Sequence, residues 1–290
     1  MQIAEALEEF LSEHRGRGSR PKTVLYYRNT LTNLLRPYLG QPVDTLTVFT
    51  VNKALQAVAE REVRPATLAS ADRALRGFCS WLCGVELLTK NPMQSKKRPK
   101  VRWEPKPVLT REEIQKLFAV AKVDKRYKDR NIAILHLLLG CGLRAGEVAK
   151  LKLKDIDWDN GIIEVNGKVG YGKVPVTKQC LQAIRRYATH SRKAQPACQW
   201  LFVYNGRGIE SSTVSKLIAR LGRRAELDRI IGAHLLRHTM ASSFIETGGD
   251  PFSLKRLLCH TSLYTTSLYV SNSTANLREK LEEYGPLKGV

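Results

Sequence analysis

The segment from residue 93 to residue 107, MQSKKRPKVRWEPKP, most constrains how this chain can fold. It holds six basic residues, three prolines and a single acidic residue. Proline lacks the backbone N–H that helices and sheets need, and so many like charges on a short stretch resist burial. We therefore predict a linker over 93–107 that separates a domain over 1–92 from a second domain over 108–290.

Residues 1–92 have the apolar periodicity of short helices. Ile3, Leu7, Phe10 and Leu11 recur at helical spacing until the glycines at 16 and 18 end the first helix. A second apolar stripe is expected in residues 23–35 and is formed by Leu25, Leu31, Leu34 and Leu35. With further helices over 51–58 and 67–82, this half is predicted to be a bundle of about four helices.

The second half mixes helices with one small sheet. Thr110 and Glu113 form a capping box that should start a helix, and the almost entirely apolar residues 129–139 predict a buried central helix. Residues 155–176 alternate around a glycine-rich turn, which predicts a β-hairpin. Helices are expected again over 212–221, 234–247, 251–258 (Asp250 as N-cap) and from 265 onward. The fold class is thus mostly α with a small β-sheet, and the catalytic half is α+β.

The charge of the chain favours a polyanionic partner. It has 48 Lys and Arg against 27 Asp and Glu, a net charge of +21, so binding to phosphates would release many counterions. Nucleic acid is the leading partner, and an acidic membrane surface is the alternative. The sequence has no apolar run of transmembrane length and no recognisable signal peptide. We expect a soluble, cytoplasmic protein associated with DNA.

The cysteines do not indicate a metal site or disulfides. Six are scattered without a CxxC motif or the paired Cys/His spacing of a zinc site. Cys79 and Cys83 lie four apart on an apolar helix face, which is typical of core residues. We expect no metal and no cofactor.

Breaking a phosphodiester without a metal requires cationic donors for the phosphate oxygens, an acid for the leaving oxygen and a stored nucleophile. Arg144 follows a turn flanked by glycines, although it could simply pair with Glu147 on a helix surface. His234 and Arg237 lie three apart, on one helical face, where both can point at one phosphate. A surface histidine beside an arginine is the alternative.

The remaining candidates lie further along the chain. Lys168 is placed in the hairpin turn, from which it could reach a phosphate or the minor groove, or could simply be solvated. His260 is followed nine residues later by Tyr269, one of ten tyrosines, most of which should serve packing.

Taken in this order, the arginine, the hairpin lysine, the HxxRH motif at 234–238 and the pair of His260 with Tyr269 resemble the tyrosine recombinase, or phage integrase-like, family. The resemblance covers essentially the whole chain, and the first half, with its motifs beginning at Ser19 and at Arg64, looks like the family's core-binding domain. It implies that residues 1–92 bind core DNA and that residues 108–290 are catalytic. Because no additional arm-binding domain is recognised before the core-binding helices, we expect the chain to be similar to the compact two-domain members, Xer-like or transposon resolvase-like.

The resemblance also implies a role for each candidate. The site comprises Arg144 and Arg237 as phosphate clamps, His234 and His260 as phosphate ligands that assist proton transfer, Lys168 as general acid, Tyr269 as nucleophile and Glu147 as a brace. Lys173 rivals Lys168, which is favoured because it directly follows Gly167. Cys259 stands where the family usually has glycine, so we expect different local packing there. Basic residues expected to contact DNA are Lys96, Lys97, Arg98, Lys100, Arg102, Lys106 and Lys173.

The implied activity is site-specific DNA recombination. Strands are broken and rejoined through a 3′-phosphotyrosyl intermediate and are exchanged between paired duplex sites, without metal or nucleotide. The resemblance further implies a homotetramer on two DNA sites, with a C-terminal helix around residues 277–284 docking into a neighbour. A type IB topoisomerase and a non-catalytic DNA-binding regulator are the alternatives.

Overall fold

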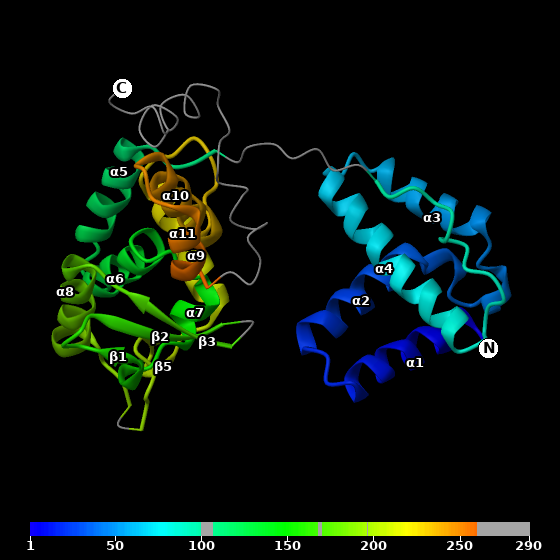
Figure 1. The fold of residues 1–290 in the computed structure, drawn as a ribbon, viewed down its shortest axis with the longest axis horizontal. Helices are drawn as coiled ribbons and strands as arrows, with labels where there is room; N and C mark the ends of the chain where they lie inside the picture. The colour runs from blue at the N-terminus through cyan, green and yellow to red at the C-terminus, as the bar shows by residue number, and fades with distance from the viewer. Residues whose placement is uncertain (100–106, 168–169, 196, 260–290) are drawn as a thin grey trace, which may run out of the picture. The chain divides into compact units, whose positions relative to one another are not determined.

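The computed structural model describes residues 1–99, 107–167, 170–195 and 197–259. Contacts divide the chain into two compact units, Met1–Pro105 and Lys106–Val290 (Figure 1). The predicted helix from 265 onward and the expected docking helix around 277–284 lie outside the described residues. Among the described helices, none combines the length and the apolar character that crossing a bilayer requires.

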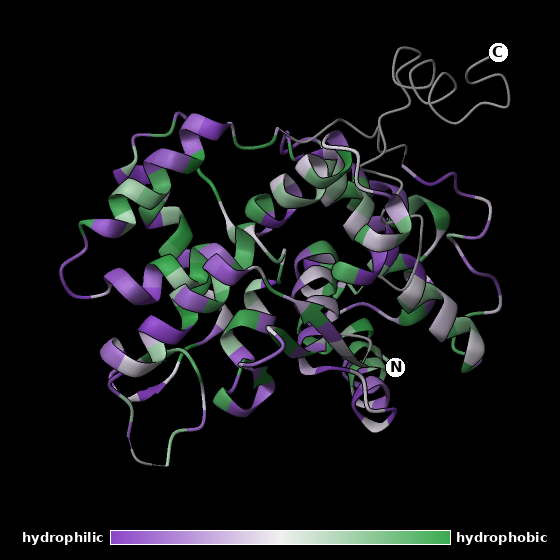
Figure 2. Ribbon diagram, turned by 60° about the vertical axis from the view of Figure 1, so that its left-hand side comes forward, coloured by the Kyte–Doolittle hydropathy of each residue, from purple (hydrophilic) through white to green (hydrophobic). Residues whose placement is uncertain are grey.

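The N-terminal unit is a bundle of four α-helices, as predicted. They are α1 (Ile3–Gly16), α2 (Pro21–Leu34), α3 (Val48–Ala59) and α4 (Pro65–Gly84), with short 3-10 turns at η1 (Arg36–Tyr38) and η2 (Val43–Thr45). The apolar residues of these helices form one buried cluster, and hydrophobic and hydrophilic residues alternate along the helices of the chain (Figure 2). Phe10 on α1 and Phe78 on α4 are both buried and meet edge to face at 5.4 Å.

The prediction that Leu25 belongs to the core of this bundle is wrong. Leu25 is 54% exposed, and Val24 is buried in its place. α2 begins at Pro21, so its buried stripe runs through Val24, Leu31 and Leu34. Residues 24 and 31 are seven apart, two full turns of an α-helix, whereas residue 25 is rotated by 100° onto the solvent side.

The first residues of the predicted linker pack on the bundle. Met93 is 1% exposed and belongs to the N-terminal core. Arg76 of α4, ion-paired with the buried Asp72 at 2.8 Å, donates hydrogen bonds to the carbonyls of Met93 (2.7 Å) and Lys96 (2.6 Å). Residues 93–96 of the predicted linker are therefore bound to α4 and do not form a flexible connection.

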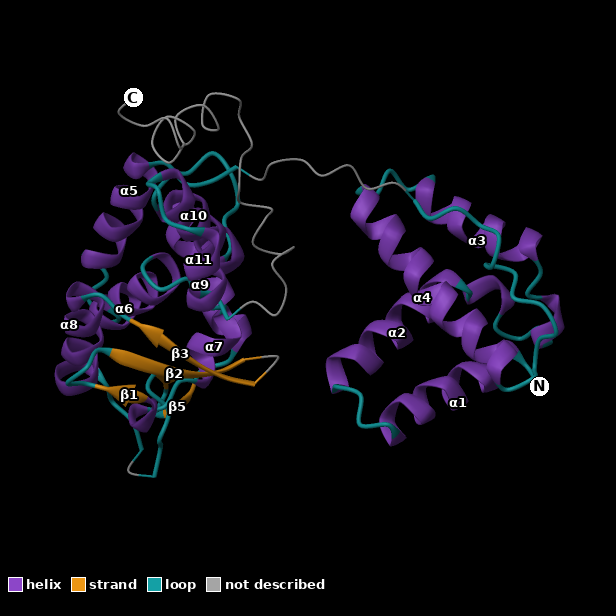
Figure 3. Cartoon of the chain, in the orientation of Figure 1, coloured by secondary structure: helices purple, strands orange, loops and turns teal. Residues whose placement is uncertain are grey.

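The C-terminal unit consists of helices around a small sheet (Figure 3). Its helices are α5 (Arg111–Lys122), α6 (Lys128–Leu139), α7 (Ala145–Lys150), α8 (Lys178–Arg186), α9 (Ser211–Arg224), α10 (Ala233–Glu246) and α11 (Pro251–Leu257), with a 3-10 turn η3 (Leu153–Asp155) and a π turn η4 (Tyr187–Ser191). The strands are β1 (Ile156–Asp157), β2 (Ile162–Gly167) and β3 (Gly170–Pro175), in the order β1-β2-β3, and a separate pair β4 (Val203–Tyr204) and β5 (Arg207–Gly208).

Local capping signals fix several of these helix starts as predicted. The Thr110 hydroxyl accepts from the Glu113 N–H at 3.2 Å, and the Glu113 carboxylate accepts from the Thr110 N–H at 2.8 Å. The Asp250 carboxylate accepts from the N–H groups of Phe252 and Ser253, both at 2.9 Å, in front of Pro251. α6 is buried along most of its length and forms the centre of this unit.

Helix α8 and its extension η4 were not predicted. Thr177 caps α8, and its hydroxyl accepts from the Cys180 N–H at 3.2 Å. Cys180 lies with its sulfur 3.6 Å from that of Cys141 in the core, and both are thiols. α8 has only two fully buried residues, Cys180 and Ile184, so its apolar stripe is too narrow to stand out from the preceding hairpin.

Candidate active site

The turn that precedes Arg144 requires a glycine at position 142. Gly142 has φ +64°, and a Cβ there would lie 2.7 Å from Leu258 Cδ2 and 3.1 Å from Met240 Sδ. Only glycine combines that backbone conformation with so close an approach. The turn brings the chain from the end of α6 to the N-cap of α7, where Arg144 lies.

Glu147 joins the two predicted arginine clamps. Its carboxylate accepts from the Arg144 backbone N–H at 2.8 Å and from Arg144 Nη1 at 2.6 Å. Its Oε2 also lies 3.8 Å from Arg237 Nη1. The Glu147 side chain is 5% exposed, whereas that of Arg144 is 40% exposed, so one buried carboxylate orients an accessible cation.

Arg237 is buried and bonds to two separate segments of backbone. Its side chain is 3% exposed, and it donates to the carbonyl of Gly142 at 2.5 Å and to the carbonyl of Leu258 at 2.8 Å. The first bond fixes the Arg144 turn, and the second fixes the end of α11. Arg237 thereby links the segment that leads to Arg144 with the segment that leads to His260.

His234 lies one helical turn before Arg237 on α10. His234 is the second residue of that helix and is exposed, whereas Arg237 is buried. The i, i+3 spacing places both on one face of the helix, as predicted.

Cys259 ends the described part of this region. Its φ is +48°, the left-handed conformation that glycine adopts without strain. Burial and the nearby Glu147 raise the pKa of the Cys259 thiol, and the cations Arg237 and Arg144 oppose that rise. These charges place Cys259 beside the arginine cluster.

The β2-β3 hairpin reaches the same cluster. A Cβ on Gly172 would lie 2.4 Å from Cys259 Sγ, so strand β3 contacts the second residue after α11. The last pair of the ladder is Gly167 with Gly170, so the predicted hairpin is present, but residues 170–172, which were expected in its glycine-rich turn, belong to β3. Lys168 itself lies outside the described residues.

Lys173 lies on the other face of this hairpin. Val165 and Val174 are buried, and neighbouring side chains along a strand point to opposite faces. Gly172 therefore faces Cys259, while Lys173 points away from it, is 74% exposed and lies 3.5 Å from Glu164 on the paired strand.

The structure thus brings Arg144, Glu147 and Arg237 together, with Gly172 of the hairpin next to Cys259 beside them. Of the other predicted residues, His260 and Tyr269 lie outside the described residues, as do Lys100, Arg102 and Lys106 of the linker. Lys97 and Arg98 are exposed, and the Lys96 ammonium bonds the Asn52 amide oxygen. The contact of Gly172 with Cys259 was not predicted from the sequence. The cysteine at position 259, where the family usually has glycine, was the feature that could have indicated it.

Known proteins resemble the chain over its whole length. The model of the phage integrase family matches residues 107–276. Tyrosine recombinase XerC of Lacticaseibacillus casei is 28% identical over 300 residues, 99% of each chain. In fold, the Tn1549 transposon integrase in complex with transposon right end DNA superposes with a TM-score of 0.82 at 23% identity, covering 98% of this chain and 99% of that one. A lambda integrase tetramer bound to a Holliday junction gives a TM-score of 0.76 at 16% identity, covering 94% of this chain and 78% of that one.

Proposed function

This chain belongs to the phage integrase family and is a tyrosine-type site-specific DNA recombinase, and from that premise we propose how its residues divide the chemistry. Tyr269 attacks the phosphorus and forms a 3′-phosphotyrosyl bond while the bond to the 5′ oxygen breaks. Lys168 gives that oxygen its proton. Because the phosphotyrosyl bond stores the energy of the broken one, rejoining needs no nucleotide and no metal.

The pairing of Arg144 and Arg237 through Glu147 is the observation that carries this proposal. A phosphoryl transition state gains negative charge on its non-bridging oxygens, and preorganised cations stabilise that charge most where water is excluded. Arg144 presents an accessible guanidinium to the scissile phosphate. Arg237, which shares Glu147 with Arg144, is the second phosphate clamp, and His234 and His260 bond the phosphate and assist proton transfer.

The hairpin geometry favours Lys168 over Lys173 as the acid. Lys173 points to the face opposite Cys259 and pairs with Glu164, so its ammonium is directed away from the arginines. Lys168 follows directly on Gly167, at the end of the ladder. We assign Lys173 to surface charge, where it can contribute to binding the DNA backbone.

We further propose that residues 1–92 and 108–290 bind the duplex as two domains and that residues 93–107 contribute phosphate contacts. Lys97 and Arg98 support this because both are exposed. Lys96 is anchored to the bundle by its bond to Asn52 and is the weaker candidate. The lambda integrase tetramer on a Holliday junction supports assembly of this chain as a tetramer on two sites.

The test of the nucleophile is trapping of the covalent adduct. Tyr269→Phe removes only the phenolic hydroxyl, so DNA binding should persist while the adduct on a nicked suicide substrate disappears. Tyr264→Phe is the matched control and should retain the adduct. Peptide mapping of the wild-type adduct checks the assignment directly, and a nucleotide found on Tyr264, Ser267 or Ser271 would refute it.

A further inference from the structure

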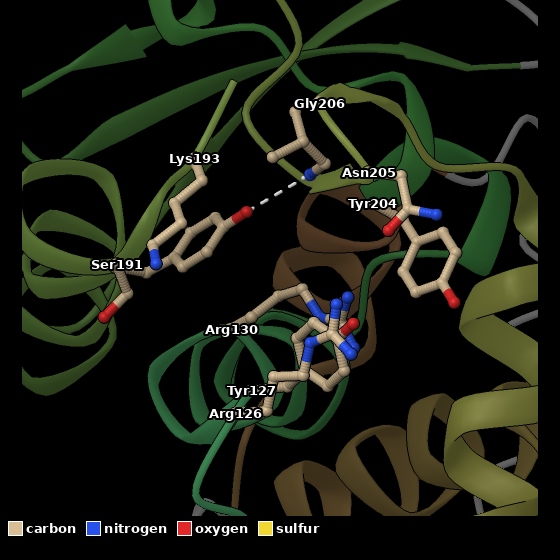
Figure 4. Close-up of a pocket in the computed structure, with 10 residues that line it drawn as sticks. Arg126, Tyr127, Arg130, Ser191, Lys193, Tyr204, Asn205 and Gly206 are labelled. Atoms are coloured by element: carbon tan, nitrogen blue, oxygen red, sulfur yellow. Dashed lines mark hydrogen bonds between the residues drawn. The ribbon is translucent and has the colours of Figure 1, made fainter. Parts of the chain in front are cut away.

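A cavity of about 240 Å³ lies between the start of α6, the turn η4 and the β4–β5 hairpin (Figure 4). α6 and the residues before it supply Arg126, Tyr127 and Arg130, and Lys193 follows η4. In Figure 4, Arg126, Tyr127 and Arg130 lie below the hairpin residues Tyr204 and Asn205, whereas Lys193 lies beside Ser191 on the other side of the cavity. None of these residues belongs to the arginine cluster of the recombinase site.

The lining is cationic without a matching acid. Arg126, Arg130 and Lys193 contribute three positive charges, and the described lining residues include no carboxylate. Two acids close to these residues in the sequence form ion pairs with other cations, although Asp124 also acts on Arg130. Asp129 pairs with Arg186 at 3.0 Å, and Asp124 lies between Arg220 (3.7 Å) and Arg224 (3.8 Å).

Arg130 is the feature that points to a ligand. The residue is 6% exposed, and its Nε and Nη1 have no hydrogen-bond partner in the described part of the chain. Nη2 makes one long bond of 3.3 Å to Asn131 Oδ1. Burial lowers the pKa of Arg130, and the neighbouring Tyr187, Tyr127 and Asp124 oppose that shift only in part.

The aromatic surroundings compensate for this burial only in part. The Arg130 guanidinium lies 3.9 Å from the centroid of the Tyr127 ring, a cation–π contact that stabilises charge without satisfying an N–H. The Tyr187 hydroxyl is occupied as acceptor for the Val203 N–H at 3.1 Å. A buried guanidinium that stacks on a ring but lacks acceptors is typical of an anion site.

We propose that this cavity binds a phosphate group, inorganic or terminal on a small metabolite, through Arg130 at its base and Arg126 and Lys193 at its rim. Phosphate presents several acceptor oxygens to an arginine fork and an ammonium at once. Ser191 and Asn205 add neutral polar groups to the lining. The cavity is smaller than the roughly 300–1,000 Å³ of pockets that hold drug-sized ligands, which favours a small anion.

A phosphate within a DNA strand fits this cavity poorly. It is linked to sugars on both sides, whereas Arg130 is 6% exposed and lines the cavity. A free or terminal phosphate can enter. The site is thus independent of the recombination chemistry.

Titration of the full chain with inorganic phosphate at constant ionic strength, followed by the phosphorus-31 linewidth, tests the proposal. Wild type should bind saturably. Arg130→Met and the rim double variant Arg126→Gln/Lys193→Gln should each weaken binding by about 10- to 100-fold, since bonds to charged groups are lost. Arg223→Met is the matched control because Arg223 is exposed on α9 and does not line the cavity.

Each outcome decides the matter. Absence of saturable binding by wild type, or an equal loss in Arg223→Met, overturns the proposal. The rim variant changes only exposed side chains and provides the decision if Arg130→Met fails to fold. A parallel titration with ribose 5-phosphate distinguishes the sources: tighter binding of the ester identifies a phosphorylated metabolite, and equal or weaker binding identifies free phosphate. Displacement of bound phosphate by a duplex with unphosphorylated ends would overturn the proposal in favour of a DNA-binding surface.

Discussion

Replacing Glu147 by glutamine tests whether one carboxylate supports both arginines. Glutamine has nearly the same shape and keeps one acceptor oxygen, so the change removes charge and leaves packing in place. Glu147 is 5% exposed and Arg237 is 3% exposed. Removing one partner of a buried ion pair destabilises a protein by about 3–5 kcal/mol. Because the amide oxygen remains, we expect about 3 kcal/mol, the lower end of that range.

The chain offers a matched control in Glu164→Gln. This residue also pairs with a cation, Lys173, but the two side chains are 54% and 74% exposed. An exposed pair contributes only about 0–1 kcal/mol. Both variants lose one negative charge from the same unit, so they differ in burial and not in net charge.

Scanning calorimetry of the full chain measures the difference. A change of 1 kcal/mol shifts the Tm of a domain of this size by about 2–4 °C, so Glu147→Gln should lower the transition of the C-terminal unit by about 6–12 °C. The N-terminal unit provides an internal reference. Cleavage should also slow because Arg144 loses its orienting partner. If Glu147→Gln lowers Tm no more than Glu164→Gln does, the carboxylate does not hold the arginines and the reasoning fails.

Three other predictions follow from the same structure. DNA affinity should fall about 10³–10⁵-fold between 50 and 200 mM salt if roughly 6–10 phosphates are contacted; a filter-binding titration with a flat salt slope contradicts this. Lys168→Ala should slow cleavage about 10²–10⁴-fold with near-normal DNA binding, and a substrate with a 5′ sulfur leaving group should rescue it; the same defect and rescue in Lys173→Ala would transfer the role. Gly172→Ala should destabilise the C-terminal unit by about 1–3 kcal/mol because its methyl group meets Cys259 Sγ; urea unfolding should show recovery in the double variant with Cys259→Gly, and no recovery would mean that the clash lies elsewhere.

The parts of the fold that the sequence predicts are those fixed by local chemistry. The capping box at Thr110, the N-cap at Asp250 and the alternation in the hairpin each act within a few residues, so they can be recognised without knowledge of the tertiary structure. The assignment of Leu25 to the core failed for the opposite reason. Val24 and Leu25 are neighbours of similar hydrophobicity, and only the packing of α2 on the bundle determines which of them faces inward.

The site shows the same division. Spacing identifies His234 and Arg237 as neighbours on one helix, but no sequence pattern connects Arg130 with Lys193 or with the β4–β5 hairpin, which are 63 or more residues further along the chain. A buried arginine inside an apolar helix could have been noticed, because such residues are rare unless paired. The absence of hydrogen-bond acceptors around Arg130 could not have been predicted from the sequence, because it depends on how the neighbouring acidic residues are paired in the folded structure.

The two arginines of the site are equivalent in the sequence and different in the structure. Arg144 is accessible and is oriented by one carboxylate, so its guanidinium is available to a ligand. Arg237 also binds the carbonyls of Gly142 and Leu258, which lie 116 residues apart and lead to opposite ends of the proposed catalytic set. A lysine ammonium is a point donor on a flexible stem and cannot reproduce this planar fork. Arg237→Lys should therefore disturb both the backbone arrangement of the site and the placement of its positive charge. Arg144→Lys should alter mainly the geometry with which one phosphate is held.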